Sequence, residues 1–137
     1  MARTSVILDA SVLVAYFDPN EQNHEWATIQ AKESPPPWIT CDAALSETFY
    51  LLHPRYKPEV IEFARRGGVR TAFSLADEIQ PVLALMEKYA DVPMSLADAC
   101  LVRMTEQLSD PILLTTDADF GIYRRHSRQI VPCVVPA

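Results

Sequence analysis

The hydrophobic positions of the chain alternate between short β-branched runs and longer stretches with helical spacing. Runs at 5–8 (SVIL), 38–40 (WIT) and 111–116 (PILLTT) are typical of buried strands. Between them, apolar residues recur at helical spacing, and Pro or Gly residues end several of these stretches. The pattern predicts helices over residues 12–17, 21–33, 43–53, 57–66, 75–89 and 95–108.

The remaining segments are less regular. Residues 119–125 predict a short helix, and 129–135 predict a last strand that Pro132 interrupts, which places it at a sheet edge. Residues 69–73 stay ambiguous, and Pro81 argues against a continuous helix over 75–89. Strands separated by helices predict an α/β fold with a short, mainly parallel sheet and helices on both faces. Ligands of such sheets bind beyond the carboxyl ends of the strands.

Composition narrows the class of protein. With 137 residues, 49% hydrophobic and 22% charged, the chain is expected to form a single domain over residues 1–137. Asp9 interrupts the first apolar run, and no uncharged stretch approaches about 20 residues, so we expect no signal peptide or membrane span and a cytoplasmic protein. Three separated cysteines, Cys41, Cys100 and Cys133, predict reduced thiols rather than disulfides or a zinc site.

Acidic residues directly follow two of the predicted strands. Asp9 follows 5–8, and Asp117 and Asp119 follow 111–116. An Asp in this position often caps the next helix, although Ser11 is an alternative cap that leaves Asp9 free to face the crevice. Asp117 and Asp119 are either turn residues or ligands.

Two further acids lie in predicted helices. Glu47 shares a helix face with Ala44, Tyr50 and Leu51, which predicts an apolar environment. A charged carboxylate buried there is costly unless a hydrogen-bond partner or a cation compensates it. Asp98 ends the capping pattern Ser95-Leu96-Ala97-Asp98 and is equally interpreted as a cap or as a site acid beside the core. Asp42 is predicted to cap the helix over 43–53.

One shared pocket explains all of these acids together. Carboxylate oxygens suit Mg²⁺, with Mn²⁺ as an alternative, and no cluster of His or Cys favours zinc. Such cations polarise a phosphoryl oxygen and lower the pKa of bound water, which is the chemistry of phosphodiester hydrolysis. Without them, the acids would repel one another and the substrate.

Four stretches together resemble the PIN-domain nucleases, particularly the VapC-type toxins of toxin-antitoxin pairs. In chain order they are VILDASVLVAYFD, ALSETFYLL, YADVPMSLADACLVRMTE and ILLTTDADFGIYRR. The resemblance spans nearly the whole chain. It implies a three-layer α/β/α domain, endoribonuclease activity on structured RNA, frequent homodimerisation, and an antitoxin partner laid across the active-site groove.

The resemblance also implies roles for particular residues. It implies an acidic quartet at the active site, made up of Asp9, Glu47, Asp98 and Asp117. Asp9 and Asp98 would be the principal magnesium ligands, and Asp119 a candidate fifth acid. It makes Thr115 or Thr116 candidates for a hydrogen bond to a ligand carboxylate, beside their ordinary role as strand residues.

The charge balance limits RNA binding. The net charge is −6 and the chain has only three lysines, which argues against broad, tight affinity for RNA unless cations mediate it. The most basic stretch contains Arg124, Arg125, His126 and Arg128, which either contact RNA phosphates or form an ordinary solvated segment.

Three other functions remain open from the sequence. A haloacid-dehalogenase-like phosphatase also begins with an Asp after the first strand, but its second acid would fall at Ser11. A non-catalytic module could hold a basic peptide in the acidic groove. A nuclease of the same fold could instead act in RNA maturation or on DNA.

Overall fold

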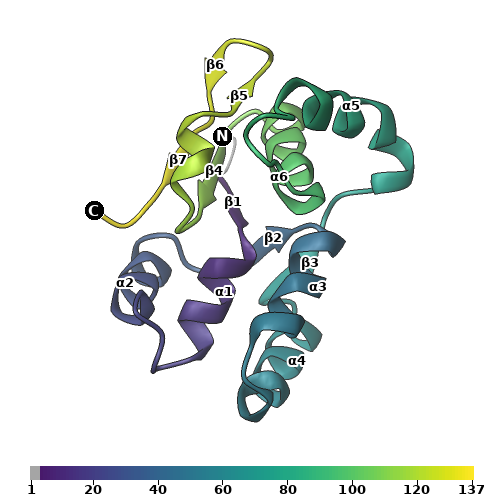
Figure 1. Cartoon of the computed structure of the whole chain (residues 1–137). Helices are drawn as coiled ribbons and strands as arrows, with labels where there is room; N and C mark the ends of the chain where they lie inside the picture. Colours follow the sequence, from purple (N-terminus) through teal and green to yellow (C-terminus); the bar gives the residue numbers. More distant parts are fainter. Residues whose placement is uncertain (1–3) are drawn as a thin grey trace.

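A five-stranded parallel sheet forms the centre of the protein, as the computed structural model, which describes residues 4–137, shows (Figure 1). The strand order is β3-β2-β1-β4-β7, and every neighbouring pair is parallel. The strands are β1 (Ser5–Leu8), β2 (Trp38–Thr40), β3 (Val69–Thr71), β4 (Pro111–Leu114) and β7 (Cys133–Val134). Because β1 is central, whatever follows it lies in the middle of the sheet's carboxyl edge.

Within the described residues, six α-helices and two 3₁₀ turns connect and cover the sheet (Figure 1). The helices are α1 (Ala10–Phe17), α2 (His24–Glu33), α3 (Asp42–Leu51), α4 (Lys57–Arg65), α5 (Leu75–Lys88) and α6 (Leu96–Gln107). The 3₁₀ turns are η1 (Pro54–Tyr56) and η2 (Ala118–Gly121). These elements alternate with the strands along the chain, as the sequence predicted.

Two separate cores lie on the two faces of the sheet. Successive residues of a strand point to opposite faces, and fully buried Ile7 packs with α5 and α6, whereas Leu8 packs with α1, α2 and Trp38. Phe63 of α4 adds to the second core, and α3 contacts both α1 and α6. The predicted three-layer α/β/α architecture is therefore confirmed.

Two predicted helix starts were wrong. The α2 helix begins at His24 rather than at residue 21, after a turn. The N-cap of α3 is Cys41, which has extended backbone angles and makes no side-chain capping bond, so Asp42 is already in the first turn. A carboxylate there still favours the helix through its dipole.

Glycine and proline have the expected effects at two other helices. Gly67 follows α4 with φ of +83°, a left-handed conformation that glycine adopts without strain. The predicted break in α5 is confirmed, because the backbone leaves helical geometry at Glu78, three residues before Pro81, and two helical segments meet there at a kink. The proline has no N–H to donate, and its ring crowds the carbonyl four residues earlier, so the helix continues with a kink.

The C-terminal region contains the largest difference from prediction. The ambiguous residues 69–71 form edge strand β3, whereas the helix predicted over 119–125 is limited to the 3₁₀ turn η2 over 118–121. The guanidinium of Arg124 donates to the carbonyls of Gly121, Ile122 and Tyr123, which a longer helix would have used for its own N–H groups. The chain instead forms the antiparallel hairpin of β5 (Arg124–Arg125) and β6 (Gln129–Ile130).

Residues 129–135 do not form one continuous strand. They divide into β6 and β7 on the two sides of Pro132, and β7 lies at the sheet edge beside β4. The interruption and the edge position are thus confirmed. Within residues 4–137, no helix is both long enough and apolar enough to cross a bilayer.

Candidate active site

The carboxyl ends of β1 and β4 bring two segments of the site together. Leu8 lies opposite Leu114 in the parallel register, and the backbone N–H of Asp9 donates to the carbonyl of Leu114 over 3.0 Å. Asp9 and Thr115 are therefore neighbours, although 106 residues separate them in the sequence.

Asp9 is nearly buried and its two carboxylate oxygens have different partners. Oδ1 accepts from the backbone N–H of Ala10 over 2.7 Å, which makes Asp9 the N-cap of α1. Oδ2 accepts from Thr115 Oγ1 over 2.7 Å and from Ser11 Oγ over 3.4 Å. The alternative in which Ser11 caps the helix was wrong, but capping still leaves the second oxygen of Asp9 at the strand ends.

Burial has a strong effect on the charge of Asp9. Its side chain is only 7% exposed, and desolvation raises its pKa from 3.8 to about 6. The hydrogen bonds from Thr115 and Ala10 oppose this rise in pKa, whereas the negative charges of Asp98 and Glu47 add to it. The fold thus holds a carboxylate in a place where its negative charge is poorly compensated.

Asp98 approaches the same region from the first turn of α6. Its Oδ2 accepts from the backbone N–H of Ser95 over 3.4 Å, completing a capping box, and from the hydroxyl of Tyr123 over 3.1 Å. Burial is the main cause that raises its pKa, and the charge of Asp117 contributes. The interpretations of Asp98 as a cap and as a site acid are therefore compatible.

Glu47 differs from expectation because its side chain is exposed to solvent. Its apolar neighbours Tyr50 and Leu51 are 86% and 53% exposed. The predicted apolar setting of Glu47 was therefore wrong: Ala44 on the same face is fully buried, but Glu47 and the two apolar residues beyond it are exposed. The charge of Glu47 nevertheless acts on Asp9.

Asp117 and Asp119 follow β4 in a tight turn. Asp117 caps η2, with Oδ1 accepting from the backbone N–H of Asp119 over 2.9 Å. The backbone N–H of Asp117 donates to Thr115 Oγ1 over 3.0 Å. Thr115, rather than Thr116, therefore links Asp9 to this turn, while Thr116 donates its backbone N–H to Ser11 Oγ over 3.2 Å.

The two candidate arginines have internal partners. Arg124 binds the three carbonyls at the end of η2, and Arg125 donates to the carbonyls of Thr105 and Leu108 at the end of α6. A cation at the C-terminus of a helix stabilises it. His126 and Arg128, which belong to the same basic stretch, are exposed at the hairpin.

The donor chemistry at the strand ends fits a divalent cation. The carboxylate of Asp9 is poorly solvated, and the neighbouring acids disfavour its charged form further, so a bound cation would stabilise it. Within residues 4–137, no three His, Cys, Asp or Glu side chains stand close enough together to form a ligand cluster. Magnesium commonly uses only one or two protein carboxylates and completes its shell with waters and phosphate oxygens.

Sequence reasoning missed two side chains that contact the acids. Ser11 donates to Asp9 and accepts from Thr116, and Tyr123 donates to Asp98. The sequence indicated Ser11 as an alternative cap but not as a donor to the Asp9 carboxylate. Tyr123 lies 25 residues from Asp98, and no local pattern relates the two. Burial and the nearby charge of Asp98 raise the pKa of the Tyr123 hydroxyl, so it remains a donor at neutral pH.

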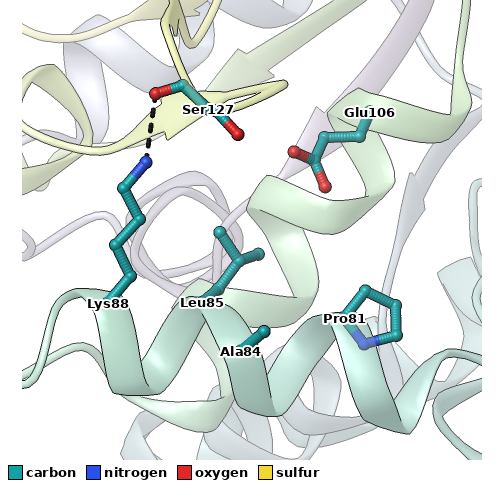
Figure 2. A pocket seen from close by; sticks show the side chains of 6 residues that line it. All are labelled: Pro81, Ala84, Leu85, Lys88, Glu106 and Ser127. Atoms are coloured by element: carbon teal, nitrogen blue, oxygen red, sulfur yellow. Dashed lines mark hydrogen bonds between the residues drawn. The ribbon is translucent and has the colours of Figure 1, made fainter.

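A cavity of about 220 Å³ lies elsewhere, between α5, α6 and the β5–β6 hairpin (Figure 2). Its two charged side chains are already engaged. Lys88 Nζ donates to the carbonyl of Ser127 over 3.0 Å, and Glu106 accepts from Arg103 and from the backbone of His126. None of the candidate site acids lines this cavity.

Comparison with known proteins agrees with this architecture. Over 131 residues, the chain is 27% identical to Ribonuclease VapC26 of Mycobacterium tuberculosis, and the alignment covers 93% of each protein. Residues 6–125 match the PIN domain family, a span that includes β1 from Val6 onward, β4 and all of the candidate acids. The chain therefore belongs to the PIN-domain family.

Proposed function

We propose that this protein is a magnesium-dependent endoribonuclease that acts as the toxin of a toxin-antitoxin system. The observation that carries the proposal is the nearly buried carboxylate of Asp9, whose pKa is raised to about 6 at the carboxyl edge of a parallel sheet. Perturbed acids in such positions are typical of functional sites. The similarity to a protein named a VapC ribonuclease supports RNA as the substrate.

In this proposal, Asp9 and Asp98 hold the cation, and Thr115 and Ser11 keep the Asp9 carboxylate in place. Asp117 and Glu47 supply further negative charge around the ion, and Asp119 lies in the same turn as Asp117. When bound, Mg²⁺ or Mn²⁺ would polarise a phosphoryl oxygen and lower the pKa of a bound water. The acids cannot supply this chemistry alone, because they repel the phosphate backbone.

The proposed substrate and partners are inferred from the similar ribonuclease and from the net charge of the chain. With a net charge of −6, the chain needs cations for close contact with RNA phosphates. Arg124 and Arg125 are secondary candidates for phosphate contacts, since their guanidinium groups already bind carbonyls. A basic antitoxin segment would complement the acidic edge, and a homodimer would align two hairpins that each contain exposed Arg128.

The proposal is tested by incubating the purified protein with total RNA, in Mg²⁺ and in EDTA, beside the Asp9→Asn variant. Fragment ends are mapped by sequencing. Discrete cuts that need both Mg²⁺ and Asp9 are expected, and they would identify the substrate.

Cuts that persist in EDTA or in the variant would contradict the proposal. If RNA stays intact while the protein cuts DNA, hydrolyses small phosphate esters, or only binds a basic peptide, the corresponding alternative replaces it.

A further inference from the structure

We propose that Tyr123 is a positioning residue, which holds one oxygen of Asp98 so that the other is presented to a divalent cation. The inference rests on the proposed function, because it concerns the same cation site. It starts from the hydrogen bond of 3.1 Å that the Tyr123 hydroxyl donates to Asp98 Oδ2.

Tyr123 itself is firmly held. Its side chain is fully buried, and its ring packs edge-on against Phe120 and Tyr89, with centroid distances of 5.2 Å and 5.1 Å. Its backbone N–H donates to the carbonyl of Asp119 over 3.2 Å, which ties it to the turn after β4. A ring packed in this way keeps its hydroxyl at a fixed point, so the hydrogen bond orients Asp98 rather than the reverse.

The two carboxylate oxygens of Asp98 differ in their hydrogen-bond partners. Oδ2 accepts from Tyr123 and from the backbone N–H of Ser95, so donors from two separate elements hold it. For Oδ1, the described residues provide no hydrogen-bond partner, in contrast to Asp9, whose two oxygens both accept. Oδ1 is thus the oxygen left to coordinate a cation, which can bind there without breaking the existing hydrogen bonds.

Outer-shell hydrogen bonds of this kind have measurable effects on metal sites. Residues that orient a ligating carboxylate commonly change metal affinity about 10–100-fold when they are removed. Tyr123→Phe removes only the hydroxyl and keeps the buried ring. We therefore expect this variant to fold normally and to bind Mn²⁺ about 10–100-fold more weakly than the wild type.

Tyr89 provides a matched control. It lies against the Tyr123 ring, is also buried, and its hydroxyl accepts from the backbone N–H of Arg124 over 2.8 Å rather than contacting an acid. Tyr89→Phe removes a hydroxyl from the same aromatic cluster without touching Asp98. Its affinity for Mn²⁺ is expected to equal that of the wild type.

The experiment measures Mn²⁺ binding to the full chain by calorimetry for the wild type, Tyr123→Phe and Tyr89→Phe, with circular dichroism as the folding check. The Mg²⁺ dependence of RNA cleavage is then recorded. If Tyr123 positions Asp98, Tyr123→Phe should need more Mg²⁺ than the wild type for half-maximal cleavage. Saturating Mg²⁺ should restore most of the rate.

The outcomes separate this inference from the proposed function. Wild-type Mn²⁺ affinity in a folded Tyr123→Phe variant would overturn the positioning role and leave the nuclease proposal standing. Equal losses in both tyrosine variants would overturn it too, because they would indicate packing alone. Absence of Mn²⁺ binding and of metal-dependent cleavage in the wild type would contradict both.

Discussion

The strand-end crevice around Asp9 and the open face of α3 around Glu47 each present a carboxylate to the same region, but in different environments. Asp9 is 7% exposed with a pKa of about 6, whereas Glu47 lies on a solvated surface beside an 86% exposed Tyr50. The sheet topology, and not the apolar character of adjacent residues, decides which acid is desolvated. In the proposed site, the strand ends would therefore bind the cation, and Glu47 would contribute only its charge from the exposed surface of α3.

The largest effect should come from removing a ligand charge at the crevice. Asp98→Asn keeps the size of the side chain but removes its charge, so we expect cleavage to fall by more than the roughly 100-fold that loss of an outer-shell partner can cost. Rates on an RNA substrate measure this effect. Asp77→Asn, which changes an exposed acid in α5, is the control and should cleave normally. Full activity in a folded Asp98→Asn variant would contradict the assignment.

The raised pKa of Asp9 predicts how stability depends on pH in the absence of metal. Because the folded state keeps a proton that the unfolded state releases, stability should fall as pH rises from about 4 to about 6 and then level off. A change from 3.8 to about 6 corresponds to about 3 kcal/mol. Urea unfolding in EDTA measures this slope, and Asp9→Asn should remove most of it. Equal slopes in the two proteins would show that the crevice does not desolvate Asp9.

Magnesium should stabilise the native state by binding it preferentially. At a concentration about 100-fold above the dissociation constant, the expected gain is about 2.7 kcal/mol, visible as a higher melting temperature. Potassium chloride of equal ionic strength controls for general screening. The same rise in Asp9→Asn as in the wild type would place the ion elsewhere.

The smallest effect should come from Glu47→Gln. Because the side chain is exposed and makes no hydrogen bond within the described residues, its substitution should change the free energy of unfolding by no more than about 0.5 kcal/mol. Urea unfolding beside Asp9→Asn provides the measurement. A loss of several kcal/mol would mean that α3 is packed more closely than the structure has it.

The fold was predictable from the sequence where local patterns and the overall topology agree. The apolar run before Asp9 and the run ending at Leu114 indicated the two central strands, and their parallel pairing placed Asp9 beside the turn of Asp117. These positions follow from the period of the strands and from the rule that parallel strands end at one edge.

The parts that the sequence did not predict depend on contacts between distant residues. The end of η2 is set by the side chain of Arg124, and the exposure of the α3 face depends on which other helices cover it. The hydrogen bond between Tyr123 and Asp98 likewise joins two elements that no local pattern connects. Helical periodicity identifies an apolar face, but it does not say whether the fold buries it.

In the proposed site, Asp9 and Asp98 bind one divalent cation at the carboxyl edge of the sheet. Anomalous diffraction from crystals soaked in Mn²⁺ tests it most directly. We expect a peak about 2.1 Å from a carboxylate oxygen of each residue. No peak there, or a peak only at other acids such as Glu47, would contradict it.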